Sequence, residues 1–154
     1  MPQMSSSAEF QSVMGVAVTK AMYQVIERCY KELQKEIQKD IYSAYSPSDY
    51  DRTEDLLNAW KKELGHLNVS LEYEPSYVIA FPPSWQHASA YDARFGNTSA
   101  MIFDILEGGY RAYNAKTGKP IPARPMWNKF LAKVDANFAK WMRAALRKQG
   151  LQVV

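Results

Sequence analysis

The hydrophobic positions in the first quarter of the chain repeat with the period of an α-helix. Between residues 8 and 40 the apolar side chains recur at steps of three and four, which places them on one face: Val18, Met22, Val25, Cys29, Leu33 and Ile37. No Pro or Gly interrupts the segment after Gly15. The pattern predicts one long N-terminal helix over residues 8–40.

A polar turn around Pro47 separates this helix from a second, shorter helical pattern. Asp51 and Glu54 have the spacing of a capping box, with Asp in the Ser/Thr position. The apolar face that follows would consist of Leu56, Leu57, Trp60 and Leu64. Glycine commonly ends a helix, so the sequence predicts a short helix that ends at Gly65.

Strict alternation of apolar and polar residues predicts a β-strand from Leu67 to Tyr73. After Pro75, a continuous β-prone run from Tyr77 to Phe81 ends at two consecutive prolines. The two runs together predict an antiparallel hairpin. Residues 84–96 follow no pattern that assigns them to an element.

A short apolar run before Gly108 and Gly109 predicts a further helix, with a strand as the alternative. Asn97, Thr98 and Ser99 offer N-terminal caps, and the glycines would end the helix. The apolar positions are Met101, Ile102, Ile105 and Leu106. Residues 110–121 are expected to form a loop or a hairpin tip.

The clearest pattern is the last one, a helix that follows Pro125 and ends at Gly150. Its apolar stripe consists of Trp127, Phe130, Leu131, Val134, Phe138, Trp141, Met142 and Ala145. This helical spacing favours burial in the core over an exposed stacking platform for single-stranded nucleic acid. The basic side chains occupy mainly the other sides: Lys129, Lys133, Lys140, Arg143, Arg147 and Lys148.

These elements predict an α+β fold with a long N-terminal helix, a small antiparallel sheet and a long amphipathic C-terminal helix packed on the sheet. The 154 residues are expected to form one domain over residues 8–150, after a disordered N-terminus at residues 1–7. No apolar run is long enough to predict a membrane span, and the first residues do not resemble a secretory signal.

Charge is distributed unevenly along the chain, although the net charge is only +3. Residues 1–110 hold 9 Lys and Arg against 15 Asp and Glu, whereas residues 111–154 hold 10 Lys and Arg and a single acid, Asp135. Two interpretations stay open: head-to-tail matching between copies of the chain, or contact with a polyanion such as DNA. For the basic side of the last helix, a merely solvated face is a further alternative.

Residues with catalytic or metal-binding chemistry are few. His66 and His87 are the only histidines, and neither lies in a known nucleophile motif. Cys29 is the only cysteine and falls on the apolar face of the first helix, where packing is its expected role. No zinc, calcium or phosphate-loop motif occurs. We therefore expect no catalytic site, no metal and no cofactor.

Three short blocks stand in a recognisable order. The block YSPSDYDRTEDL contains Tyr45, Pro47, Tyr50, Arg52 and Thr53; ILEGG contains Glu107 and Gly109; IPARPMW contains Ala123, Arg124 and Pro125. On these residues the chain, from about residue 13 to residue 146, resembles the tail-completion or head–tail joining proteins of long-tailed phages. It departs from that family at Glu54, where a glycine is usual, and in a longer and more aromatic segment over residues 82–96.

The resemblance implies a structural role. Such proteins form rings, commonly hexamers, in the neck of the virion, where the tail meets the head. They contact head-completion or adaptor proteins and the tail tube or its terminator, while DNA passes through the lumen without sequence-specific binding. The protein would be made in the host cytoplasm and need no cofactor, catalytic residue or membrane.

Aromatic residues in two expected loops are candidates for interface anchors: Trp85, Tyr91, Tyr110 and Tyr113. A Tyr-rich core and rim would explain the 13% aromatic content equally well. Two other functions stay open. One is a tail terminator that caps the tail tube, and the other is a small DNA-binding module that uses the basic C-terminal helix.

Overall fold

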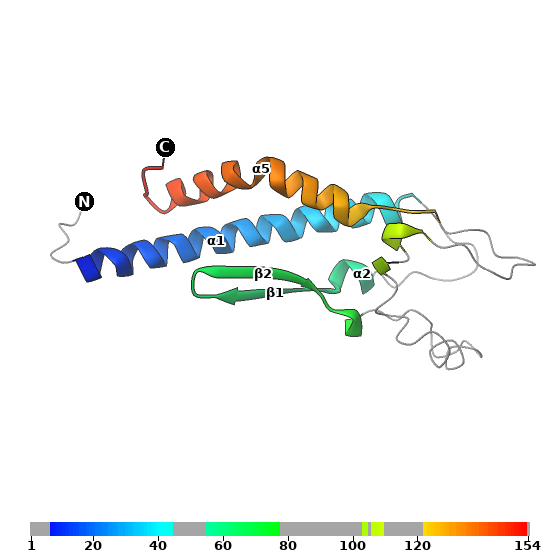
Figure 1. Ribbon diagram of the computed structural model, residues 1–154, viewed down its shortest axis with the longest axis horizontal. Coiled ribbons are helices and arrows are strands. Elements are labelled where there is room, and N and C mark those ends of the chain that lie inside the picture. Colours follow the sequence, from blue (N-terminus) through cyan, green and yellow to red (C-terminus); the bar gives the residue numbers. More distant parts are fainter. Residues whose placement is uncertain (1–6, 45–54, 78–102, 105, 110–121, 154) are drawn as a thin grey trace, which may run out of the picture.

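A computed structural model describes residues 7–44, 55–77, 103–104, 106–109 and 122–153. Two long helices, α1 (Ser7–Ile37) and α5 (Met126–Lys148), run side by side along the long axis (Figure 1). Between them in sequence lie a short helix α2 (Asp55–Asn58) and two strands, β1 (Trp60–Gly65) and β2 (Asn68–Tyr73). The predicted α+β fold, with a long helix at each end and a small antiparallel sheet, is confirmed.

Helix α1 begins and ends close to the predicted limits. A π-helical turn, Gln38–Tyr42, continues it and buries Ile41. The predicted apolar face of α1 is confirmed as part of the core, since two of its residues, Leu33 and Ile37, are fully buried. The predicted disordered N-terminus lies, apart from Ser7, outside the described residues.

The hairpin uses a different pair of strands from the pair that we expected. β1 pairs with β2 in an antiparallel register that runs from Trp60↔Tyr73 to Gly65↔Asn68, and His66 and Leu67 form the turn. The predicted helix up to Gly65 is therefore wrong beyond α2. Residues four apart share a face in a strand as well as in a helix, so the spacing of Trp60 and Leu64 fits both.

The second predicted strand, Tyr77–Phe81, which was expected to pair with Asn68–Tyr73, is wrong at its first residue. Residues Pro75–Tyr77 form a 3-10 turn instead of opening a strand, and residues 78–81 lie outside the described residues. The predicted helix before Gly108 is confirmed where it is described, because residues 103–104 and 106–108 are helical. Gly109 follows it with φ 76°, the left-handed conformation typical of a helix end.

Helix α1 forms the middle layer, with α5 on one side and the hairpin on the other (Figure 1). The C-terminal helix was expected to pack on the sheet, but it packs mainly on α1 and meets β1 where Trp127 stacks on Trp60. A two-stranded sheet offers too narrow a face to cover a helix of 23 residues. The long groove along α1 supplies the necessary apolar length.

One continuous core joins the three layers. Its buried members are Ala21, Val25, Ile26, Cys29, Leu33, Ile37, Ile41, Leu56, Ala59, Trp60, Met126, Phe130, Trp141 and Ala145. Val69, Leu71 and Tyr73, which alternate along β2, pack partly buried against it. The face of β2 predicted from the two-residue period is therefore the face that meets the core.

Candidate functional site

The start of α5 is held by residues of the ILEGG block. The Glu107 carboxylate accepts hydrogen bonds from the backbone N–H groups of Trp127 and Asn128, each at 3.0 Å. The backbone N–H of Arg124 donates to the Leu106 carbonyl at 2.7 Å. The two bonds to Glu107 satisfy N–H groups of α5 that have no partner within the helix, and they place a negative charge at the positive end of its dipole.

Glu107 is needed because the local sequence supplies no cap. Pro125 occupies the N-cap position of α5 and makes no side-chain cap hydrogen bond. Ser, Thr, Asp or Asn would normally fill this role. A carboxylate from 20 residues earlier in the sequence takes their place, so the second and third blocks form one structural unit, the motif junction (Glu107, Gly109 and Ala123–Pro125).

An aromatic cluster lies next to the motif junction. The rings of Trp127 and Trp60 stack with centroids 5.1 Å apart and planes inclined by 10°. Phe103 packs edge-on against both, at 5.7 Å from Trp60 and 5.9 Å from Trp127. Tyr73 of β2 joins them, and burial, with the nearby charge of Asp104, raises its pKa to about 12. The cluster ties α5, the hairpin and the helical residues before Gly109 together.

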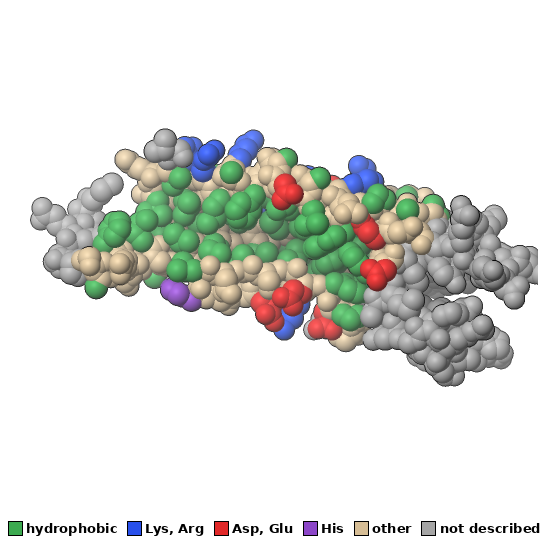
Figure 2. All heavy atoms as spheres, viewed as in Figure 1, with side chains coloured by type: hydrophobic (Ala, Val, Ile, Leu, Met, Phe, Trp, Pro, Cys, Tyr) green, Lys and Arg blue, Asp and Glu red, His purple; other side chains and the backbone are tan. Residues whose placement is uncertain are grey.

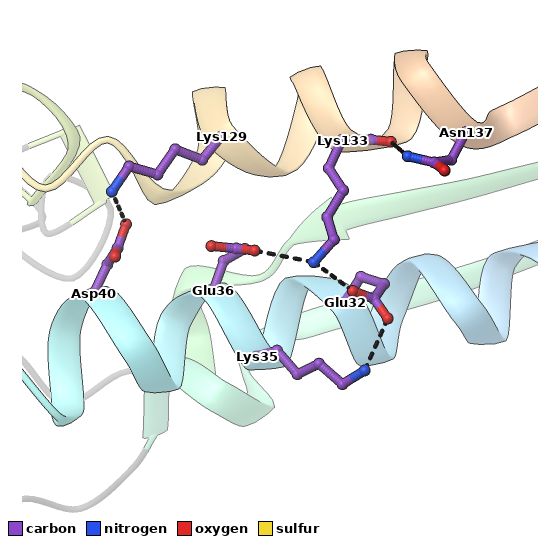
Figure 3. Close-up of polar contacts among 7 residues, drawn as sticks. All are labelled: Glu32, Lys35, Glu36, Asp40, Lys129, Lys133 and Asn137. Carbon is purple, nitrogen blue, oxygen red and sulfur yellow. Dashed lines mark hydrogen bonds and ion pairs between the residues drawn. The ribbon is translucent and has the colours of Figure 1, made fainter.

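Acidic residues of α1 and basic residues of α5 pair along the seam between the two helices (Figure 3). Lys133 bridges Glu32 and Glu36 at 2.6 and 3.1 Å, and Lys129 pairs with Asp40 on the π-helical turn. The hydrogen bond from Lys133, followed by that from Lys35, lowers the pKa of Glu32 below its ordinary value. The acidic front and the basic end of the sequence are therefore matched in part within one chain.

One further cation of the seam comes from α1. The guanidinium of Arg28 lies 4.6 Å from the centroid of the Trp141 ring. We call this set of contacts, from Asp40–Lys129 through Glu32/Glu36–Lys133 to Arg28–Trp141, the seam ladder. Because its rungs progress towards the N-terminus of α1 as α5 proceeds, the two helices are antiparallel.

The comparisons with known proteins identify a family. The sequence profile named YomN matches residues 7–148, from the first residue of α1 to the last residue of α5. The chain belongs to the YomN family. This is a family of phage-derived proteins. None of the curated proteins and none of the solved structures is significantly similar to the chain.

The structure brings together five of the residues singled out in the sequence of this YomN-family chain. Glu107, Gly109, Ala123, Arg124 and Pro125 all lie at the motif junction. The remaining candidates lie outside the described residues: Tyr45, Pro47, Tyr50, Arg52, Thr53, Trp85, Tyr91, Tyr110 and Tyr113. Sequence reasoning missed the capping role of Glu107, although the lack of a capping side chain before Met126 was a usable signal.

The apolar stripe of α5 is confirmed as core in most positions but not in all. Phe130, Trp141 and Ala145 are buried, as are parts of Trp127, Val134 and Met142. Leu131 and Phe138, in contrast, remain 39% and 49% exposed. The stripe is wider than the surface that α1 covers, so its flank faces outwards.

The residues whose side chains could serve in catalysis or metal binding form no such site in the described part of the chain. Cys29 is buried in the core, and burial raises the pKa of its thiol. His66 lies exposed at the hairpin turn beside Gly15, whereas His87 lies outside the described residues. Within the described ranges, no group of three or more His, Cys, Asp and Glu is placed to hold a metal ion. No helix in these ranges has the length and apolar character required to cross a membrane.

Proposed function

We propose that this protein is a structural component of the phage neck, which assembles into a ring that completes the tail and joins it to the head. Membership in a family of phage-derived proteins supports a viral role. The resemblance to tail-completion proteins adds the finer assignment. It rests on three short blocks that stand in the order of that family.

The motif junction is the observation that carries the proposal. Glu107 and the Ala123–Pro125 block were matched to the tail-completion family separately, and residues 108–122 separate them in sequence. In the structure they meet, because Glu107 of the second block caps the helix that the third block opens. A chance match of letters gives no reason for such a contact. Shared architecture does, because both blocks then contribute to the start of α5.

The first experiment measures the mass of the purified protein in solution, alone and mixed with tail tubes of the same phage. A neck protein should form a ring or bind as a ring at one end of each tube, which electron microscopy of the mixture would resolve. A protein that remains monomeric in the presence of tubes and heads would contradict the proposal.

Tube length separates tail completion from termination. A terminator stops tube growth, so tubes assembled in its absence should exceed the native length. Tubes that lack a completion protein should keep the native length and fail to join heads. We expect the second outcome.

The DNA-binding alternative predicts a different result from the same preparation. A monomer that ignores tail tubes but retards DNA in gels, with an affinity that falls steeply as salt rises, would favour a nucleic-acid-binding module. The seam ladder lowers this expectation, since Lys129 and Lys133 are engaged by carboxylates of the same chain.

A further inference from the structure

The first turns of α1 form an apolar arm that nothing in the described part of the chain covers. Phe10, Val13 and Val16 recur at steps of three and remain 52%, 47% and 52% exposed. Ala17 is the first residue of α1 that is described as buried, and His66 of the hairpin turn lies beside α1 at Gly15. Figure 1 shows this end of α1 projecting past both the hairpin turn and the end of α5.

A second uncovered apolar surface lies on the flank of α5. Besides Leu131 and Phe138, the exposed positions between them and up to residue 139 are three alanines and a single charged residue, Asp135. Interface cores are depleted in charge, and small residues allow a second helix to approach closely. Figure 2 shows hydrophobic side chains gathered over α1 and α5 along much of one face of the molecule.

The arm cannot cover the α5 flank of its own chain. Phe138 lies between Lys133, which binds Glu32, and Trp141, which packs on Arg28, so the flank is beside this level of α1. Phe10 is 18 residues away along the same helix, which corresponds to about 27 Å at the rise of an α-helix. The two surfaces can therefore meet only between different molecules.

We propose that the arm (Ser7–Val16) docks on the α5 flank (Leu131–Ala139) of a second copy of this chain. Both stripes are about 10 Å long, since Phe10–Val16 and Leu131–Phe138 span seven and eight residues of helix. Two different surfaces that meet in this way form a heterologous contact, which closes into a ring when the rotation permits. The inference rests on the proposed function, because it names the contact that would build the neck ring.

Charge favours an antiparallel arrangement of the two helices. Residues 7–19 contain no Lys or Arg and one acid, whereas α5 contains Lys140, Arg143, Arg147 and Lys148, and no acid, after Asp135. An arm whose N-terminal end points towards the C-terminal half of α5 matches these charges. It also aligns the positive end of one helix dipole with the negative end of the other.

The size of the contact indicates when it forms. A helical arm of ten residues covers on the order of a few hundred Å², less than the roughly 800 Å² per partner of a stable interface. One such contact is therefore weak. In a closed ring every copy uses both its arm and its flank, so the contacts reinforce one another through effective concentration.

Cross-linking of mixed variants, each with one added surface cysteine, tests the contact directly. Val13→Cys and Asp135→Cys place a thiol at the middle of the arm and of the flank, so the result does not depend on helix direction. We expect a short bis-maleimide to give a covalent dimer when the two variants are mixed, and neither variant to give one alone. The wild type, with its buried Cys29, and a mixture of Asp135→Cys with Lys31→Cys serve as controls.

Each other outcome has a defined meaning. A dimer from Asp135→Cys alone would indicate a two-fold flank-to-flank contact, and one from Val13→Cys alone an arm-to-arm contact; either overturns the inference. Rings that form in solution or on tail tubes without cross-linking in the mixture also overturn it, while the proposed function stands. Cross-linking in the mixture without any binding to tubes would keep the contact and remove the neck assignment. If neither rings nor cross-links form, both fail.

A charge inserted into the arm gives a second, quantitative test. Val13→Glu should weaken self-association at least ten-fold and leave the melting temperature of the monomer unchanged, because Val13 is already half exposed. Gln11→Glu adds the same charge to the same arm away from the apolar stripe, so it should leave association nearly unchanged. Equal weakening by both variants would contradict a contact through the stripe.

Discussion

At the scale of single residues, Glu107 has the most specific role in the described structure. Its two carboxylate oxygens accept from two consecutive N–H groups of α5, a helix with no side-chain cap of its own. Glu107→Ala should lower the free energy of unfolding by about 0.5–2 kcal/mol, the range for loss of a helix cap. Glu107→Gln, which keeps one acceptor oxygen, should lie between this variant and the wild type. Urea denaturation measures both, and Glu72→Ala, an exposed carboxylate on β2, should change the value little.

A second residue, Leu67, carries backbone strain. It has φ 61° at the second position of the hairpin turn, a left-handed conformation that is unfavourable for a residue with a Cβ atom and easy for glycine. Because Leu67 is about half exposed, little burial is lost on its removal. Leu67→Gly should therefore raise the free energy of unfolding by about 1 kcal/mol. Leu64→Gly, an exposed position within β1, should instead lower it; a loss at both positions would argue against strain at Leu67.

At the scale of elements, the seam ladder links stability to pH. Hydrogen bonds from Lys133 and then Lys35 lower the pKa of Glu32 in the folded state. The contribution of Glu32 to folding stability is therefore present above its unfolded pKa and is lost as pH falls through its folded pKa. Hydrogen bonding to Glu32 raises the pKa of Lys133, whose contribution is therefore present below its unfolded pKa and lost as pH rises through the folded one. The pairing of α1 with α5 should be strongest across neutral pH and weaken at both extremes.

Removal of one partner tests this linkage. Lys133→Met should reduce the loss of stability between pH 7 and pH 3 by about 0.5–1 kcal/mol, the range for a partly exposed ion pair. Lys31→Met, on an exposed position of α1, removes the same charge away from the seam. If the two variants show the same pH dependence in urea denaturation, the ladder does not hold the helices together.

The elements differ in how far the sequence determines them. Helices α1 and α5 were predictable because their apolar stripes repeat over about five turns of helix, which no strand can imitate. The register of the hairpin was not, because Trp60 and Leu64 share a face in either structure, and because Leu67 adopts a turn conformation that its residue type disfavours. The cap on α5 depends on Glu107, 20 residues away, and such a contact follows only from the tertiary fold. The width of α1 decides which part of the apolar stripe on α5 stays exposed. The spacing of residues in α5 holds no information on that width.

At the scale of the whole molecule, the seam ladder should set how many cations are available to a polyanion. Lys133 is held by Glu32 and Glu36, so Glu32→Gln/Glu36→Gln should release it. Each additional phosphate contact steepens the dependence of log K on log salt by about 0.9 for duplex DNA. The double variant should therefore bind DNA more tightly, with a slope steeper by about 1. Glu72→Gln/Asp104→Asn, which changes the net charge equally at two exposed carboxylates that make no ion pair within the described ranges, should leave the slope unchanged.

The salt dependence of DNA binding by the wild type also bears on which of the two functions the protein has. Lys140, Arg143 and Lys148 are exposed on α5 and make no ion pair within the described ranges, so some weak DNA binding is expected from any protein with this surface. Lys140→Ala/Arg143→Ala should remove about two units of slope, whereas Lys20→Ala/Lys31→Ala on α1 should remove none. Removal of the α5 cations separates the two functions, because a DNA-binding module would then lose its activity. A neck protein would still reach the tail tube, since its arm and flank carry neither of these cations.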